Sequence, residues 1–129
     1  MHPLLFDEGL PGGASVSTAL VALEWEARTV GSPGAPPSGS ADDINCRWCK
    51  SNQAILVTHD RGKTNREILK LLDQFEVSAI MVFADLRRQP PRHLARALLL
   101  AEGEIDAIIS GRRRLRHRLR ASGHLTKPK

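Results

Sequence analysis

The chain has 129 residues, which suits one domain that buries about two thirds of the surface of its unfolded chain. No stretch approaches the roughly 20 apolar residues of a membrane-spanning helix, so we expect neither a membrane anchor nor an export signal, and a cytoplasmic location. Only 4% of the residues are aromatic and none is tyrosine, which excludes an extended platform for stacking single-stranded bases.

The first part of the chain alternates strand and helix patterns. Residues 4–6 are a short apolar run that predicts a buried strand, and residues 14–25 have apolar side chains at helical spacing. Residues 26–30 predict a second, weaker strand. The Gly- and Pro-rich residues 31–39 predict a loop, which is either a substrate rim or a plain connection.

A helix-start signal follows this loop. Ser40 supplies a hydroxyl cap and two aspartates follow it in the first turn, which predicts a helix over residues 40–51. Cys46 and Cys49 share one face of that helix. Zinc needs four ligands as a rule and the chain has no second cysteine pair, so we expect both thiols to pack in the interior, in a reducing compartment.

The pattern then continues along the chain. We predict strands over residues 54–58 and 77–83, with a helix from residue 64 or 65 to residue 75 between them. Pro90-Pro91 suits the first turn of a further helix, and Gly103 is expected to interrupt it. The alternation favours a single α/β domain over residues 1–129, with three α/β/α layers and a mostly parallel sheet of four or five strands.

Charge is distributed unevenly. Residues 1–85 carry 7 basic and 11 acidic side chains, whereas residues 86–129 carry 12 basic and 3 acidic ones. The basic segment at about residues 111–129 has Leu115 and Leu119 four residues apart, which predicts an amphipathic helix. The arginine fork matches phosphate, so we expect an RNA backbone as the partner, with an acidic protein as the rival. The expected phosphate contacts are Arg112, Arg113, Arg114, Arg116, Arg118 and Arg120.

Acidic side chains follow the strands of this predicted sheet. Asp7 and Glu8 end the first strand, Asp60 follows the strand at residues 54–58, and Asp42 opens a helix. Ligands of open α/β sheets bind beyond the carboxyl ends of the strands, so we expect these carboxylates at one crevice. Crowded carboxylates repel one another unless a cation lies between them, and hard oxygen ligands suit Mg²⁺ or Mn²⁺. Such a set can activate water to cleave a phosphodiester.

Other interpretations stay open. Asp42 can simply favour a helix N-terminus, and Asp60 can be an ordinary turn residue. A phosphoacceptor receiver domain also places acids after two strands, but it needs a hydroxyl residue after the fourth strand and a lysine after a fifth, which the sequence does not indicate. The main alternative is a non-catalytic binding module that uses the arginine-rich segment. A homodimer through an exposed apolar helix face is compatible with either function.

Three segments together resemble the PIN-like nuclease superfamily, and within it a small bacterial, toxin-like branch. That branch has a strand ending Asp-Glu-Asn-Leu-Pro, then Ser-Asp, then Val-Thr-x-Asp. Here residues 7–11 read Asp-Glu-Gly-Leu-Pro, Asp42 follows, and residues 57–60 read Val-Thr-His-Asp. The resemblance covers roughly residues 3–85. It departs from the family where glycine replaces the usual asparagine and where Arg61-Gly62-Lys63 replaces the usual Asp-Phe.

The resemblance implies a metal-dependent endoribonuclease, the toxin of a toxin–antitoxin pair, with RNA as substrate and a cognate antitoxin as a further partner. The metal would be Mg²⁺ or Mn²⁺. A supporting hydroxyl would come from Thr58, and the fourth acid would be Asp85, with Glu67 as its alternative. The implied acids at the metal are Asp7, Asp42 and Asp60, with Glu8 beside them.

Overall fold

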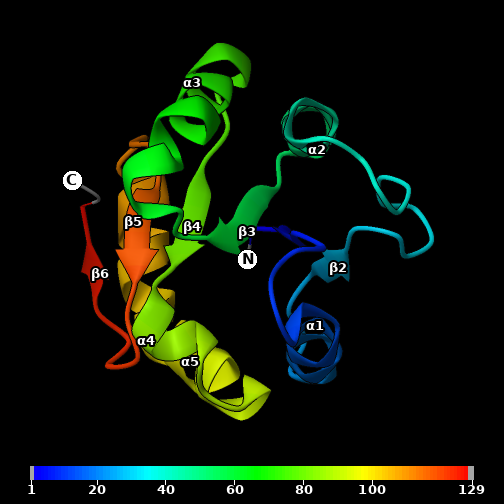
Figure 1. The fold of residues 1–129 in the computed structure, drawn as a ribbon. Helices are drawn as coiled ribbons and strands as arrows, with labels where there is room; N and C mark the ends of the chain where they lie inside the picture. Colours follow the sequence, from blue (N-terminus) through cyan, green and yellow to red (C-terminus); the bar gives the residue numbers. More distant parts are fainter. Residues whose placement is uncertain (1, 128–129) are drawn as a thin grey trace.

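The computed structural model describes residues 2–127, the side chain of Lys63 excepted, as one α/β domain (Figure 1). Strands and helices alternate along most of this part of the chain, as predicted. The elements are β1 (Leu4–Phe6), α1 (Gly13–Ala22), β2 (Ala27–Thr29), α2 (Asp42–Asn52), β3 (Ile55–His59), the short helix η1 (Gly62–Thr64), α3 (Asn65–Phe75), β4 (Ala79–Val82), α4 (Ala84–Arg87), α5 (Pro91–Ser110), β5 (Arg116–Leu119) and β6 (Leu125–Thr126).

The strands form one sheet in the order β2-β1-β3-β4-β5-β6. All neighbouring pairs are parallel except β5 and β6, which are antiparallel. From β1 the chain steps to one side to add β2 and then crosses to the other side to add β3. In open parallel sheets the crevice for a ligand lies where the strand order reverses, beyond the carboxyl ends of the strands. In this domain that position is between the ends of β1 and β3.

Helices cover both faces of the sheet, in agreement with the three-layer prediction, but within residues 2–127 the sheet has six strands rather than the predicted four or five (Figure 1). Side chains alternate between the faces along each strand. Phe6 and Val57 lie in the apolar cluster under α1 and α5, whereas Leu5 and Leu56 lie in the cluster under α2 and α3. The central strands are buried on both sides, and this explains why their sequences are continuously apolar rather than alternating.

The C-terminal segment corrects one prediction. Residues 116–119 form β5, a fifth parallel strand, and the chain then turns back into β6; the expected amphipathic helix is absent from the described residues 111–127. A spacing of four puts Leu115 and Leu119 on one side of a strand as well as of a helix, so the pattern did not discriminate. Strand pairing satisfies the open edge of β4, because Ala79 and Phe83 donate backbone hydrogen bonds to these two leucines.

Two helix predictions were also wrong in detail. Helix α5 runs without interruption through Gly103, because Ala101 and Ile105 on either side of it are buried in the core and outweigh a helix penalty of about 1 kcal/mol. The residue that precedes α2 is Ala41, and no side chain caps this helix. Ser40 instead donates its hydroxyl hydrogen bond to the carbonyl of Pro37, within the preceding loop.

Candidate functional site

Asp7 and Thr58 meet at the carboxyl ends of β1 and β3. Phe6 pairs in register with Val57, so the next residues on the two strands lie side by side. The Thr58 hydroxyl donates a 2.8 Å hydrogen bond to Asp7 Oδ2, and the backbone N–H of Gly9 donates one of 3.3 Å to Asp7 Oδ1. Thr58 is fully buried and the Asp7 side chain is 13% exposed. The predicted supporting hydroxyl is therefore in contact with the first predicted acid.

Arg61 lies between Asp7 and Asp42. Its Nη1 is 2.7 Å from Asp42 Oδ2 and its Nη2 is 3.1 Å from Asp42 Oδ1, so the guanidinium and the carboxylate form a bidentate pair. Arg61 Nη2 is also 3.7 Å from Asp7 Oδ2. The hydrogen bonds that Arg61 donates to Asp42 and the charges of both aspartates raise the pKa of Arg61 against the effect of burial. The guanidinium of Arg61 therefore supplies the positive charge that the neighbouring carboxylates of Asp7 and Asp42 require.

Asp60 has a separate set of partners. Its Oδ1 accepts hydrogen bonds of 2.6 Å from Asn65 Nδ2 and 3.0 Å from the N–H of Gly62, and its Oδ2 is paired with Arg118. The Asp60 side chain is 3% exposed. Burial by itself would raise the pKa of Asp60, but the bonds from Asn65 and Gly62 and the charge of Arg118 together lower it. Asp60 is therefore an ionised, fully paired carboxylate.

The other predicted acids lie apart from this group. Glu8 is exposed and accepts a hydrogen bond from the Ser38 hydroxyl and a 2.7 Å hydrogen bond from the Gly39 N–H. It thereby fixes the end of the loop at residues 31–39. These bonds lower the pKa of Glu8. Asp85 is exposed in α4, where its Oδ2 lies 3.5 Å from the backbone nitrogen of Ala121.

Mg²⁺ or Mn²⁺ needs carboxylate oxygens that are free to bind it, and most oxygens of the predicted acids already have protein partners. Both oxygens of Asp42 bind Arg61, both oxygens of Asp60 have protein donors, and Asp7 accepts from Thr58 and Gly9. Within residues 2–127 no three His, Cys, Asp or Glu side chains form a group that could hold a metal ion. Asp7 and Asp42 share Arg61, whereas Asp60 pairs with Arg118 and Asp85 is exposed in α4, so the four predicted acids do not form one metal site in this arrangement.

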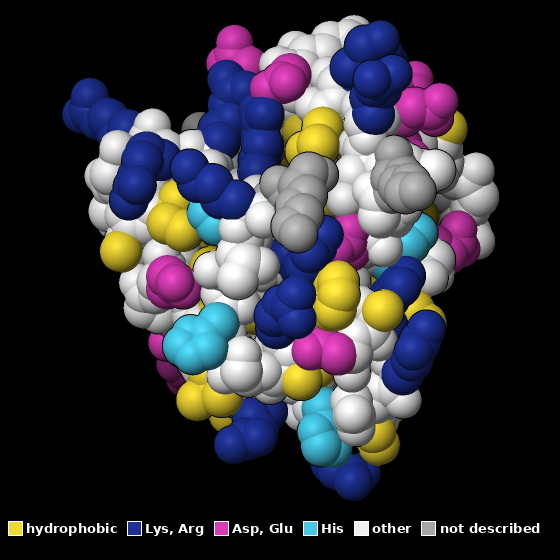
Figure 2. All heavy atoms as spheres, turned by 60° about the vertical axis from the view of Figure 1, so that its left-hand side comes forward, with side chains coloured by type: hydrophobic (Ala, Val, Ile, Leu, Met, Phe, Trp, Pro, Cys, Tyr) yellow, Lys and Arg dark blue, Asp and Glu magenta, His cyan; other side chains and the backbone are white. Residues whose placement is uncertain are grey.

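The six arginines of the C-terminal run are mostly engaged with the body of the protein. Arg114 and Arg116 pair with acids at the end of α3, namely Asp73 and Glu76. Arg112 and Arg113 are exposed, directly after α5. The guanidinium carbons of Arg118 and Arg120 lie 4.7 Å and 4.3 Å from the ring centre of Phe83. Figure 2 shows Lys and Arg side chains over this side of the molecule with Asp and Glu side chains among them.

A pocket of about 490 Å³ opens beyond the carboxyl ends of β3 and β4. Arginines from three different segments line it: Arg61 after β3, Arg87 from α4 and Arg118 from β5. The other lining residues are His59, Asp60, Gly62, Thr64, Phe83 and Ala84, and the charge of Asp60 is paired with Arg118. Burial, together with the charges of Arg61 and Arg87, lowers the pKa of His59, so its imidazole is neutral near pH 7.

Sequence reasoning missed Arg61, Arg87 and Phe83 as site residues. The departure of Arg61-Gly62-Lys63 from the PIN-like pattern was the available signal for Arg61, because a cation there replaces an expected acid. Arg87 gave no signal, since the short helix α4 was not predicted and the residue stands outside the dense arginine run. The fifth strand ends at Leu119 and is followed by Arg120 rather than a lysine, and Phe83-Ala84 follows β4, so the receiver-domain pattern is not completed.

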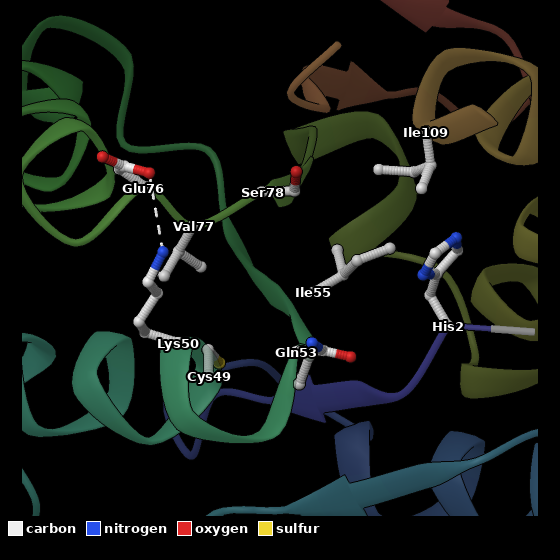
Figure 3. Close-up of a pocket in the computed structure, with 10 residues that line it drawn as sticks. His2, Cys49, Lys50, Gln53, Ile55, Glu76, Val77, Ser78 and Ile109 are labelled. Atoms are coloured by element: carbon white, nitrogen blue, oxygen red, sulfur yellow. Dashed lines mark ion pairs between the residues drawn. The ribbon is translucent and has the colours of Figure 1, made fainter. Parts of the chain in front are cut away.

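A second pocket, of about 320 Å³, lies at the opposite edge of the sheet, near the start of β3 and β4 (Figure 3). Lys50 and Glu76 form a 3.5 Å ion pair on one side of it and His2 lies on the other. Cys49 also lines this pocket, and Cys46 is buried nearby in the same apolar cluster; both are free thiols. Both cysteines are buried in this cluster, as expected, and burial raises the pKa of Cys46 to about 12 and raises that of Cys49 further.

Comparisons with known proteins add nothing to this geometry: no family model, curated protein or solved structure matches the chain. No helix within residues 2–127 is both long enough and apolar enough to cross a membrane.

Proposed function

We propose that this domain binds RNA and that the pocket lined by Arg61, Arg87 and Arg118 takes a phosphate of the RNA backbone. The observation that carries the proposal is that three arginines, from three separate segments, line one cavity at the carboxyl ends of the strands of a parallel sheet. This edge is where open α/β sheets bind their ligands. Arginine is the side chain whose planar fork matches phosphate oxygens.

The three guanidinium groups differ in what they can offer a phosphate. Arg61 and Arg118 already neutralise aspartates, whereas no ion pair to Arg87 is found among the side chains that the structure describes. Arg87 is therefore the pocket arginine without a counterion among the described side chains, and it is available to pair with a phosphate. Phe83, with Arg118 and Arg120 over its ring, offers a single aromatic contact. The affinity of such a site comes mainly from phosphate contacts and depends little on base sequence.

Anisotropy of a fluorescein-labelled single-stranded RNA, measured over a range of salt concentrations, tests this function. We expect Arg87→Ala to weaken binding on the order of fivefold at physiological salt and to reduce the log–log salt slope by about 0.7, because one phosphate contact is lost. Arg47→Ala is the matched control: Arg47 lies in α2, over the ring of Phe75, and outside the pocket. Equal effects of the two substitutions would contradict a phosphate site at the pocket.

A metal-dependent ribonuclease, the toxin of a toxin–antitoxin pair, is the second function we propose. It is favoured by the meeting of Asp7, Thr58 and Asp42 where the strand order reverses. A cognate antitoxin would then cover this crevice. This second function requires bound RNA to displace the Arg61 side chain from Asp7 and Asp42, and it predicts cleavage of the same RNA in Mn²⁺ or Mg²⁺ that Asp7→Asn abolishes. RNA that is bound but left intact would favour the non-catalytic module.

The compartment and the oligomeric state belong to the same proposal. Two free, buried thiols suit the reducing cytoplasm that we propose. Val21 and Leu23, at the end of α1, are 53% and 55% exposed and supply the apolar surface for the proposed homodimer.

A further inference from the structure

The carboxyl ends of β1 and β3 hold two carboxylates that share one counterion. Three of their four oxygens, both of Asp42 and Oδ2 of Asp7, lie within 3.7 Å of a guanidinium nitrogen of Arg61. The remaining oxygen, Asp7 Oδ1, accepts from the N–H of Gly9. A divalent cation would need oxygens that this arrangement already uses.

Hydrogen bonds of the Arg61 backbone, as well as those of its side chain, fix the position of this residue. Its N–H donates a 2.7 Å hydrogen bond to Asn65 Oδ1, and its carbonyl accepts a 2.8 Å bond from the Thr64 hydroxyl. Asn65 is 2% exposed, and its Nδ2 binds Asp60 at the same time. The buried amide thereby fixes the turn after β3, from which Arg61 reaches toward the start of α2.

Exposure favours this pairing over solvation of the separate charges. The side chains of Asp7 and Arg61 are 13% and 17% exposed, and that of Asp42 is 34% exposed. Charges that have lost most of their water need a close partner of opposite sign, and a bidentate guanidinium–carboxylate pair is among the strongest such contacts. A positioned guanidinium therefore competes effectively with an ion from solution.

We propose that Arg61 is the resident cation of the Asp7–Asp42 pair, in the place that Mg²⁺ or Mn²⁺ would need, so that guanidinium and divalent metal exclude each other there. This inference does not rest on RNA binding. It has a direct consequence for the nuclease function: a metal ion can use these carboxylates only after the Arg61 side chain has left them.

Calorimetric titration of Mn²⁺ into the purified protein tests the exclusion. We expect no saturable binding that depends on Asp7 in the native protein. Arg61→Met keeps the length and the apolar stem of the side chain but removes its charge, and it should bind about one Mn²⁺ per chain. The double variant Arg61→Met/Asp42→Asn is the matched control, and it should lose this binding. Saturating Mn²⁺ should also raise the melting temperature of Arg61→Met by about 5 °C while leaving that of the native protein unchanged.

Two results would overturn the proposal. One is saturable Mn²⁺ binding by the native protein that Asp7→Asn abolishes; the other is a folded Arg61→Met that gains no Mn²⁺ binding. If Arg61→Met is too unstable to titrate, Arg61→Gln, which stays polar but has no charge, takes its place with the same expected gain. Because the readout is metal binding, failure here leaves the RNA-binding proposal standing, and failure of RNA binding leaves this inference standing.

Discussion

Among the described residues, ion pairs occur in two groups, one at each end of the strands of the sheet, and the two groups differ in exposure. The amino-edge cluster combines acids at the end of α3 with basic residues beside them, namely Asp73, Glu76, Lys50, Arg114 and Arg116. The carboxyl-edge cluster is Asp7, Asp42, Asp60, Arg61 and Arg118. The acids of the amino-edge cluster are 61–64% exposed, whereas those of the carboxyl-edge cluster are 3–34% exposed.

This comparison shows that the number of arginines predicts neither how much they stabilise the fold nor how many of them lack a counterion. Exposed pairs contribute about 0–1 kcal/mol because water and salt screen them. Removing one partner of a buried pair costs more, because the other partner is left charged and without a counterion. Arg116 and Arg118 are only two residues apart on β5, yet they belong to different clusters and are expected to have different energetic weight.

The largest effect is expected for Asp60→Asn. Loss of this charge leaves Arg118, which is 14% exposed, without its counterion, and should cost about 3 kcal/mol in the free energy of unfolding, measured in urea at pH 7. Asp85→Asn makes the same chemical change in an exposed residue at the same edge and should cost less than about 0.5 kcal/mol. Similar losses in the two variants would mean that the buried pair has no special weight.

Lowering the pH should remove the difference in unfolding free energy between the native protein and Asp60→Asn. The folded state holds the pKa of Asp60 below its ordinary value, so the stabilisation is present above about pH 3.9 and is lost as the pH falls through the folded pKa. The gap in unfolding free energy between the native protein and Asp60→Asn should therefore narrow below about pH 4. A gap that stays constant down to pH 2 would show that Asp60 acts through its shape rather than its charge.

An intermediate effect is expected for Arg61→Met, about 2 kcal/mol, because Asp42 is partly exposed and can regain water. A double-mutant cycle with Asp42→Asn, read from urea unfolding, isolates the pair. The coupling energy should be about 1–2 kcal/mol, since each single change removes the same bidentate contact. Additive losses would argue against the bidentate contact as the source of stability.

The smallest effect is expected in the amino-edge cluster. Asp73→Asn should cost less than about 1 kcal/mol, although Asp73 contacts both Arg114 and Arg116, because its side chain is 64% exposed. The loss should shrink further in 1 M salt, because the Debye length falls to about 3 Å and exposed charges farther apart than this are largely screened. A loss as large as that of Arg61→Met would remove the distinction between the two clusters.

Much of the fold could be predicted from local patterns. The apolar runs at residues 4–6 and 54–58 indicated buried strands, because they are too short for helices and lie between turn residues. The alternation of strands with helices then required a mostly parallel sheet covered on both faces. The C-terminal segment was ambiguous for a physical reason: a spacing of four residues suits one face of a helix and one face of a strand equally well.

The sequence by itself also determined that Asp7 and Asp60 would follow buried strands at one end of the sheet and that clustered carboxylates would need a cation. Only the tertiary structure decided which cation that is and which acids share it. Arginine is long and flexible, so its partner depends on which segments come within its reach in the folded chain. Arg61 reaches back to α2 and β1, while Arg118 reaches across from β5 to Asp60. Neither distance is encoded in local sequence, because each is set by the order of the strands in the sheet.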